Sequence, residues 1–280
     1  MSNLTTRWFA VLYKICYRSP PKSPEGVAVG RPRTERFAGN MTDQPDRMKQ
    51  LYAARLTVDP MLELEHGFRV VDTHAHLDHD ERAVTTYGRD TGPDELEREC
   101  HQAGIVRAAV SPSPRPRDEG YLRANNAIAR LSVDRPFLAF ARLNGALDPT
   151  GGPVAAVRNW RPTRENYHTR PGDVEQYAYD DRFHGFVLDP AIDGLPDGAV
   201  LDELAAVDLP VVVYCREAFP PRAAEGELIG EGFPVVLAGF GGYPHDHERM
   251  TQSLDLLDAY DRLYLDTWAV RSRELLERGL

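Results

Sequence analysis

The sequence predicts an α/β protein: a (β/α) barrel of the TIM type, incomplete, with about seven of the usual eight βα units. Three observations lead to this fold class. From residue 68 onward, short apolar runs alternate with stretches that have helical periodicity. The apolar runs do not alternate with polar residues, which is typical of strands buried on both faces of a parallel sheet. The 280 residues, 42% of them hydrophobic, suffice for one large core rather than two.

Each apolar run is rich in Val, Leu and Phe, and we expect a strand in each. The predicted strands are Phe68–Asp72, Val106–Val110, Phe137–Leu143, Gly185–Leu188, Pro210–Tyr214, Pro234–Ala238 and Leu263–Leu265.

Helical segments lie between these strands. The predicted helices are Asp94–Ala103, Tyr121–Val133, Ala199–Ala206 and Arg249–Tyr260. In the last one, Met250, Leu254 and Leu257 recur every three or four residues, so one helix face is apolar. A strand followed by a helix, repeated along the chain, indicates right-handed βαβ units. An open, doubly wound sheet is the alternative, but no G-x-G-x-x-G follows the first strand to support a dinucleotide site.

The stretch 148–182 interrupts this rhythm. It contains Gly151-Gly152-Pro153, a short predicted helix through Val157, and then a polar loop rich in Arg and Tyr. Long insertions after a barrel strand commonly build substrate pockets or lids. A plain exposed insertion is the alternative interpretation.

Residues 1–40 differ in composition from the rest. They hold seven Lys or Arg against two Glu, a formal charge of +5, whereas the whole chain carries −10, which leaves −15 on the other 240 residues. We expect 1–40 to be a disordered or spurious N-terminal extension, with Met41 or Met48 as the true start. The barrel domain then occupies 41–280.

Seven predicted units between residue 68 and the end leave the barrel one unit short. The first and last predicted strands should then each have an open edge. Exposed strand edges favour pairing with other chains, so low solubility or a homo-oligomer is expected.

The composition excludes several classes of protein. The net charge of −10 argues against binding to nucleic acid or to an anionic membrane, and no run of 18 apolar residues predicts a spanning helix. The chain has thirty Arg but three Lys, which indicates either a salt-adapted organism or codon bias, and in both cases a prokaryotic cytosol. Three cysteines without a C-x-x-C favour neither a disulfide framework nor a zinc ribbon. We therefore expect a cytoplasmic protein.

The most informative string is VVDTHAHLD, residues 70–78, at the end of the first predicted strand. Residues two apart on a strand point to the same face, so Asp72, His74 and His76 should share one side. At the C-terminal mouth of a barrel that side is the interior, where active sites are built. Two imidazoles on one rigid strand form half of a divalent metal site.

This string, together with HGFVLDP, LPVVVYC, VVLAGFGG and RLYLDTWAV, resembles the amidohydrolase-related family of metal-dependent hydrolases and decarboxylases. The match covers most of residues 68–270 in order. The resemblance implies a distorted barrel that binds zinc or another divalent ion at the strand mouths. It also implies a metal that activates water, or that helps to release carbon dioxide from an aromatic acid.

The chain departs from the family pattern at its other metal positions. The family usually has a histidine at the end of strand five and another at the end of strand six, where this chain has Tyr214 and Gly239. In strand four, KLHP-like strings are frequent, and this chain reads VLDP with Asp189. The aspartate expected after strand eight would come after Leu280. The resemblance therefore predicts a degenerate metal site.

Two carboxylates could compensate. Asp189, at the mouth of the fourth strand, and Asp266, after Leu263–Leu265, could complete a His-His-Asp ligand set or act as the catalytic base. Alternatively, each caps a helix or pairs with arginine. Arg142 is a candidate to bind a substrate carboxylate, with a structural ion pair as the alternative. Tyr214 could donate a hydrogen bond to substrate or fill the ligand position.

Further candidates have simpler interpretations. Cys215 should face the helices as a buried, inert thiol. His245 and His247 lie near the mouth and could supply a ligand, but Asp246 more simply caps the next helix. No G-x-S-x-G or Ser/His/Asp set indicates a nucleophilic triad.

Three hypotheses follow. The first is a metal-dependent hydrolase with a degenerate site that acts on a small amide, ester, lactone or carboxylate, or a decarboxylase of a small carboxylic acid. The second is a non-catalytic barrel that serves as a binding protein. The third is a shortened product of a longer gene that cannot close its barrel.

Overall fold

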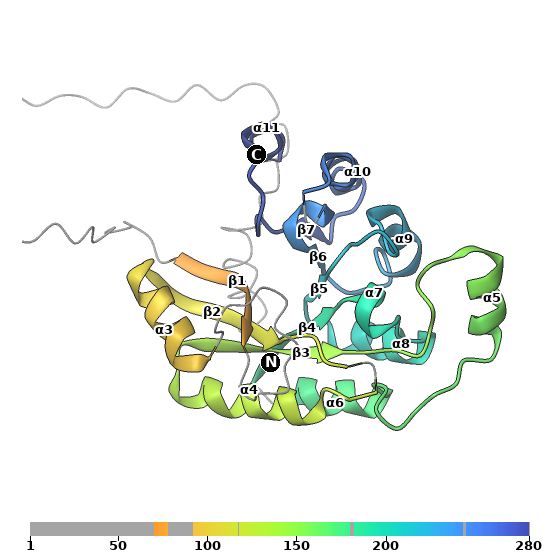
Figure 1. Cartoon of the computed structure of the whole chain (residues 1–280), viewed down its shortest axis with the longest axis horizontal. Helices are drawn as coiled ribbons and strands as arrows, with labels where there is room; N and C mark the ends of the chain where they lie inside the picture. The colour runs from red at the N-terminus through yellow and green to blue at the C-terminus, as the bar shows by residue number, and fades with distance from the viewer. Residues whose placement is uncertain (1–69, 78–91, 117, 180–181, 243–244, 280) are drawn as a thin grey trace, which may run out of the picture. The chain divides into compact units, whose positions relative to one another are not determined.

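The computed structural model of the chain describes residues 70–77, 92–116, 118–179, 182–242 and 245–279. They form one parallel sheet of seven strands, in which each strand pairs with the next one along the chain (Figure 1). The strands are β1 (Val70–Leu77), β2 (Ile105–Pro112), β3 (Phe137–Leu143), β4 (Phe183–Leu188), β5 (Val211–Val213), β6 (Val235–Leu237) and β7 (Leu263–Leu265). The predictions on residues 1–40 and on the start codon lie outside these ranges.

The sheet confirms the predicted fold class. Its strand order, β1 to β7, is that of a TIM barrel with fewer than eight strands, and β1 and β7 end the sheet in the described part of the chain. All seven predicted strands are present. The first one continues to Leu77, so both histidines of the VVDTHAHLD string lie within β1 rather than after it.

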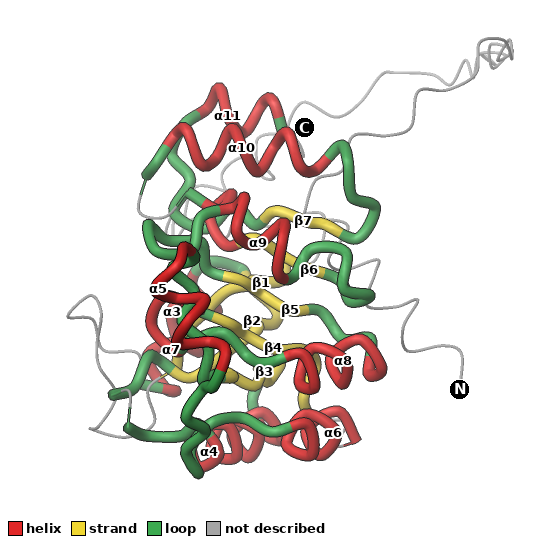
Figure 2. Tube along the Cα trace, turned by 90° about the vertical axis from the view of Figure 1, so that its right-hand side faces the viewer, coloured by secondary structure: helices red, strands yellow, loops and turns green. Residues whose placement is uncertain are grey.

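Most of the helices pack along the outside of the curved sheet, whereas the helix of the insertion after β3 stands away from it (Figures 1 and 2). The helices are α3 (Pro93–Gln102), α4 (Leu122–Asp134), α5 (Gly152–Trp160), α6 (Pro171–Tyr179), α7 (Pro190–Asp193), α8 (Gly198–Val207), α9 (Pro221–Glu227), the 3-10 turn η1 (Ala238–Gly241), α10 (His247–Leu257) and α11 (Arg273–Arg278). Of these, α10 lies next to β7 at one end of the sheet, whereas α4 and α6 lie near β3 and β4 (Figure 2).

The four predicted helices are confirmed within three residues at each end as α3, α4, α8 and α10. Asp246 caps α10, because its side chain accepts hydrogen bonds from the backbone N–H groups of Glu248 and Arg249. The predicted polar loop after Val157 is wrong in part, since α5 continues to Trp160 and α6 follows. Helix α6 buries only Val174 and Tyr177, so its sequence carries little helical periodicity.

Two apolar clusters fill the structure on opposite faces of the sheet. The outer one lies between strands and helices and contains Cys215, as predicted; burial raises the pKa of this thiol to about 12. The inner one fills the barrel with alternate strand residues, among them Phe140, Val187, Val212, Tyr214 and Tyr264. Residues that continue this inner face at the strand ends therefore meet at the barrel mouth.

None of the helices in the described ranges is both long and apolar enough to cross a lipid bilayer.

Candidate functional site

Strand β1 carries a register shift against β2 directly after Asp72. Asp72 lies opposite Ala108, which packs in the outer cluster, whereas His76 lies opposite Ser111. The side chain of Asp72 accepts a hydrogen bond of 2.9 Å from the backbone N–H of His74. The expectation that Asp72 shares a face with both histidines is therefore wrong, because the bulge breaks the two-residue alternation.

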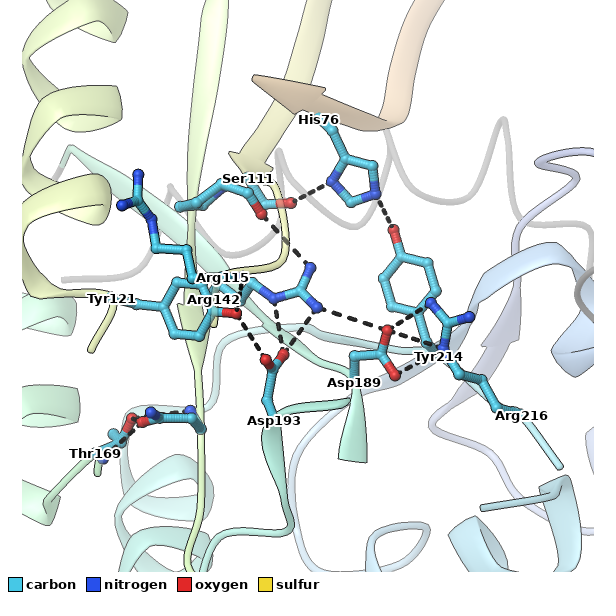
Figure 3. Close-up of polar contacts among 12 residues, drawn as sticks. His76, Ser111, Arg115, Tyr121, Arg142, Thr169, Asp189, Asp193, Tyr214 and Arg216 are labelled. Atoms are coloured by element: carbon cyan, nitrogen blue, oxygen red, sulfur yellow. Dashed lines mark hydrogen bonds and ion pairs between the residues drawn. The ribbon is translucent and has the colours of Figure 1, made fainter. Parts of the chain in front are cut away.

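The two histidines meet side chains from three other strand ends. Nδ1 of His74 lies 2.7 Å from Oδ2 of Asp266, and Nε2 of His74 contacts the hydroxyl of Tyr214. The same hydroxyl lies 2.8 Å from Nε2 of His76, whose Nδ1 lies 3.4 Å from Oγ of Ser111 (Figure 3). We call these five residues the histidine cluster.

One arrangement of protons that satisfies every contact in the histidine cluster runs from Ser111 to Asp266. Ionised Asp266 accepts the Nδ1–H of His74, and Nε2 of His74 accepts the hydroxyl proton of Tyr214. The oxygen of Tyr214 accepts the Nε2–H of His76, and Nδ1 of His76 accepts from Ser111. The cluster is thus a directed hydrogen-bond chain, able to pass protons between its members.

Burial keeps two groups in the middle of this hydrogen-bond chain, His76 and Tyr214, uncharged. It lowers the pKa of His76 well below 6.5, an effect that the nearby positive charges of Arg142 and Arg216 reinforce. Burial also raises the pKa of Tyr214 well above 10. At neutral pH His76 is therefore a neutral imidazole and Tyr214 a neutral phenol.

Backbone N–H groups of the segment after β6 and of the turn after β7 hold the carboxylate of Asp266 in place. Its Oδ1 accepts the backbone N–H groups of Gly239 (2.5 Å) and Trp268 (3.0 Å), so Oδ2 is directed at His74. The indole of Trp268 stacks on the His74 ring, with ring centroids 4.6 Å apart. Asp266 thus orients His74, in the way that carboxylates set the tautomer of functional histidines.

Gly239 has a backbone conformation that explains its identity. Its φ of +56° lies in the left-handed region, and a Cβ added there would lie 2.8 Å from the carbonyl oxygen of Trp268. The resemblance places a histidine at this position. A side chain at this position would require the backbone to move. The conformation of the turn therefore explains why glycine stands where the family has a histidine ligand.

A second group of charged residues lies beside Tyr214 (Figure 3). Arg142 pairs with Asp193 through Nε and Nη2, both at 2.8 Å, and its Nη2 lies 3.5 Å from Asp189. Arg216 forks onto Asp189 with Nε at 2.9 Å from Oδ1 and Nη2 at 2.7 Å from Oδ2. We call these four residues the arginine cluster. Its two positive and two negative charges balance, and the side chains of Arg142, Asp189 and Asp193 are almost fully buried.

The structure thus divides the predicted site residues. His74, His76, Tyr214 and Asp266 come together, whereas Arg142 and Asp189 belong to the neighbouring arginine cluster. Both oxygens of Asp189 accept from Arg216, which corresponds to the arginine-paired alternative. The catalytic and binding roles predicted for these residues stay predictions.

Sequence reasoning missed three residues of the two clusters, and also Trp268, which stacks on His74. Arg216 lies two residues after Tyr214 and Ser111 two residues after the inward-facing Ala109, so strand alternation could have indicated both. Asp193 is the last residue of the short helix α7 and Trp268 lies in the turn after β7, so strand alternation indicates neither.

The donors present do not fit a catalytic zinc ion in this arrangement. Catalytic zinc takes three protein ligands and an open position. Here the Tyr214 hydroxyl occupies the point on which Nε2 of both His74 and His76 converge. Within the described ranges, no three His, Cys, Asp or Glu side chains lie close enough together to hold a metal ion. The predicted zinc at His74 and His76 would require Tyr214 to move.

A small cavity adjoins the histidine cluster. It has a volume of about 10 Å³, is lined by Thr73, His74, Ser111 and Tyr214 among others, and would hold about one water molecule.

No protein-family model and no curated protein matches this chain. Similar solved structures include a probable 2-pyrone-4,6-dicarboxylic acid hydrolase from Acinetobacter baumannii with citric acid bound, 14% identical over 76% of each chain, with a TM-score of 0.45. Amidohydrolase 2 from Bifidobacterium longum subsp. infantis is 14% identical over 75% of this chain and 78% of its own, with a TM-score of 0.47. An uncharacterized TIM-barrel protein from Bordetella bronchiseptica is 14% identical over 71% and 74%, with a TM-score of 0.45.

Proposed function

We propose that this chain is a barrel protein of the hydrolase type that cleaves a small ester, lactone or amide by proton transfer through Asp266, His74 and Tyr214. One observation carries the proposal: the Tyr214 hydroxyl lies between Nε2 of His74 and Nε2 of His76, and Asp266 supports His74 from behind. A phenol, an imidazole and a carboxylate in sequence provide an acid, a base and a group that orients the base.

Hydrolysis would proceed as follows. A substrate carbonyl oxygen takes the hydrogen bond of the Tyr214 hydroxyl and so frees Nε2 of His74. His74 accepts a proton from a water molecule, whose oxygen attacks the carbonyl carbon, and the carboxylate of Asp266 stabilises the imidazolium. Tyr214 donates to the oxyanion that develops. His74 then returns the proton to the leaving oxygen or nitrogen, which completes the reaction.

A metal-dependent hydrolase is the second candidate function. Two features favour it. The Nε2 atoms of His74 and His76 point to the same place, where a metal ion could bind both. The carboxylate of Asp266 contacts Nδ1 of His74, as carboxylates commonly do with histidines that bind a metal. This function requires the Tyr214 side chain to leave the position between the two rings.

Metal content and chelator sensitivity separate the two candidates. Purified wild-type chain should hold less than about a tenth of an equivalent of any divalent metal, and a chelator should not change its hydrolysis of p-nitrophenyl esters or small lactones. A stoichiometric metal that is lost from His74→Ala, together with chelator-sensitive activity, would favour the metal enzyme instead.

Variants test the roles within the proton-transfer site. His74→Ala and Tyr214→Phe should each reduce kcat/KM by about a hundredfold or more, since each removes the base or the acid. Tyr179→Phe, a change on a tyrosine that is 92% exposed, is the matched control and should leave activity unchanged. Wild-type protein that hydrolyses none of these substrates would contradict the proposal and favour a non-catalytic binding protein.

A further inference from the structure

A second, larger cavity lies beside the arginine cluster. Its volume is about 630 Å³, within the range of small-molecule pockets of about 300–1,000 Å³. The segment after β3, the end of α5 with the loop that follows it, and the segment 190–194 form its walls. It has no lining residue in common with the histidine cluster.

Side-chain hydrogen bonds hold the insertion after β3 in place around this cavity. The side-chain oxygen of Asn144 accepts the backbone N–H of Thr169 (2.9 Å). The side-chain amide of Asn159 accepts the backbone N–H of Asp148 (2.8 Å) and donates to its carbonyl oxygen (2.9 Å). Arg158 pairs with Asp148 at 2.8 Å. Residues 148–168, the first part of the stretch that interrupts the alternation of strands and helices, are therefore folded into a defined wall.

The opposite wall is formed where the backbone segment 145–147 packs closely against the segment 193–195. The N–H of Gly145 donates to the carbonyl of Asp193 (2.9 Å), and Leu147 and Leu195 exchange two backbone hydrogen bonds. Gly194 has a φ of +77°, and a Cβ added there would lie 2.2 Å from the Gly145 carbonyl oxygen. Only glycine permits this close contact between the two backbone segments.

One of the arginines that line the cavity has no carboxylate partner among the described residues. Each of the three carboxylates in the lining has an arginine partner. The pairs are Glu119 with Arg115 (3.5 Å), Asp148 with Arg158 (2.8 Å) and Asp193 with Arg142 (2.8 Å). Arg161, also in the lining, forms no ion pair with any described residue, and its guanidinium lies 5.4 Å from the ring centroid of Trp160. The rim therefore offers an uncompensated positive charge.

Apolar side chains complete the lining, among them Leu147, Pro149, Pro162 and Ile192. A guanidinium at the rim and an apolar wall are complementary to a molecule with one carboxylate and an apolar body. We infer that this cavity binds a small, partly apolar carboxylic acid, whose carboxylate pairs with Arg161. This site is separate from the histidine cluster and does not depend on the proposed hydrolase activity.

Benzoate and its neutral analogue benzamide test this inference by calorimetric titration of the full chain. Benzoate should bind at millimolar concentration or tighter, and benzamide about tenfold or more weakly, because it lacks the charge. Arg161→Gln should weaken benzoate binding by about tenfold, whereas Arg161→Lys, which keeps the charge, should weaken it less. Arg130→Gln is the matched control, an exposed arginine of α4 outside the lining.

Three results would overturn the inference: equal binding of benzoate and benzamide, unchanged binding by Arg161→Gln, or no benzoate binding at all. His74→Ala locates the bound molecule. Unchanged benzoate affinity in this variant supports the cavity, whereas a loss of affinity would place benzoate at the histidine cluster and contradict the inference. Failure of hydrolysis in the proposed function would leave these binding results unaffected.

Discussion

The hydroxyl oxygen of Tyr214 lies 2.8 Å from Nε2 of His76 and also contacts Nε2 of His74. Both imidazoles were predicted from the sequence to be metal ligands, and both instead contact the hydroxyl of Tyr214. This one contact joins β5 to β1 across the barrel and determines what the site can do. It supplies a hydrogen-bond donor and an acceptor where a metal ion would supply a positive charge.

Removal of that hydroxyl should destabilise the fold. In Tyr214→Phe, Nε2 of His74 loses its donor and Nε2 of His76 its acceptor, both in buried surroundings, at an expected cost of about 1–3 kcal/mol in the free energy of unfolding. Urea titration measures this change. Tyr179→Phe, on an exposed tyrosine, should change the value by less than about 0.5 kcal/mol. Equal stability of the two variants would mean that the hydrogen bonds of Tyr214 contribute nothing.

The turn after β6 should not accept a side chain. Gly239→Ala places a Cβ 2.8 Å from the Trp268 carbonyl oxygen at a left-handed φ, so we expect a loss of about 1–3 kcal/mol in unfolding free energy. Gly226→Ala is the control, since it lies in α9 with nothing within 4 Å of an added Cβ. Ala is the better helix former, so the control should be neutral or stabilised by up to about 1 kcal/mol. Melting curves that coincide for the two variants would contradict the geometry of this turn.

The arginine cluster should be sensitive to the loss of one charge. Asp189→Asn leaves Arg142 and Arg216 with one carboxylate fewer in a buried place, and we expect a loss of about 3–5 kcal/mol. The control, Asp208→Asn, breaks a pair with Arg262 in which both side chains are nearly half exposed, and should cost about 0–1 kcal/mol. Denaturant unfolding of both variants provides the comparison. A small loss for Asp189→Asn would show that the two arginines are better solvated than their burial indicates.

Acid should destabilise the protein through His76. Burial lowers the pKa of this histidine well below its unfolded value of 6.5, so below pH 6.5 the unfolded chain binds a proton that the folded chain does not. The stability is therefore fully present above pH 6.5 and is lost as the pH falls below it, by up to about 1.4 kcal/mol per pH unit for one group. Unfolding free energies of wild type and His76→Gln between pH 7 and pH 5 test this, because the variant should have the shallower slope. Identical slopes would mean that His76 titrates normally in the fold.

The strands were predictable because their cause is local. A parallel strand buried on both faces is apolar throughout, so runs such as Phe137–Leu143 mark the sheet without any knowledge of their neighbours. Inward alternation then carried the site prediction for His76 and Tyr214, which both face the barrel. It failed at Asp72, because a bulge is a property of the pairing between two strands and leaves no mark in the sequence of one.

The sequence by itself determined the order of the strands, the presence of two histidines on β1 and the inward direction of Tyr214, since each follows from residue type and short-range spacing. Only the tertiary structure decided that the Tyr214 hydroxyl reaches both rings, that Asp266 lies behind His74, and that Asp189 is held by Arg216. Tyr214 is 138 residues from His76 and Asp266 is 192 residues from His74, and such contacts depend on the curvature of the sheet that brings distant strand ends to one mouth.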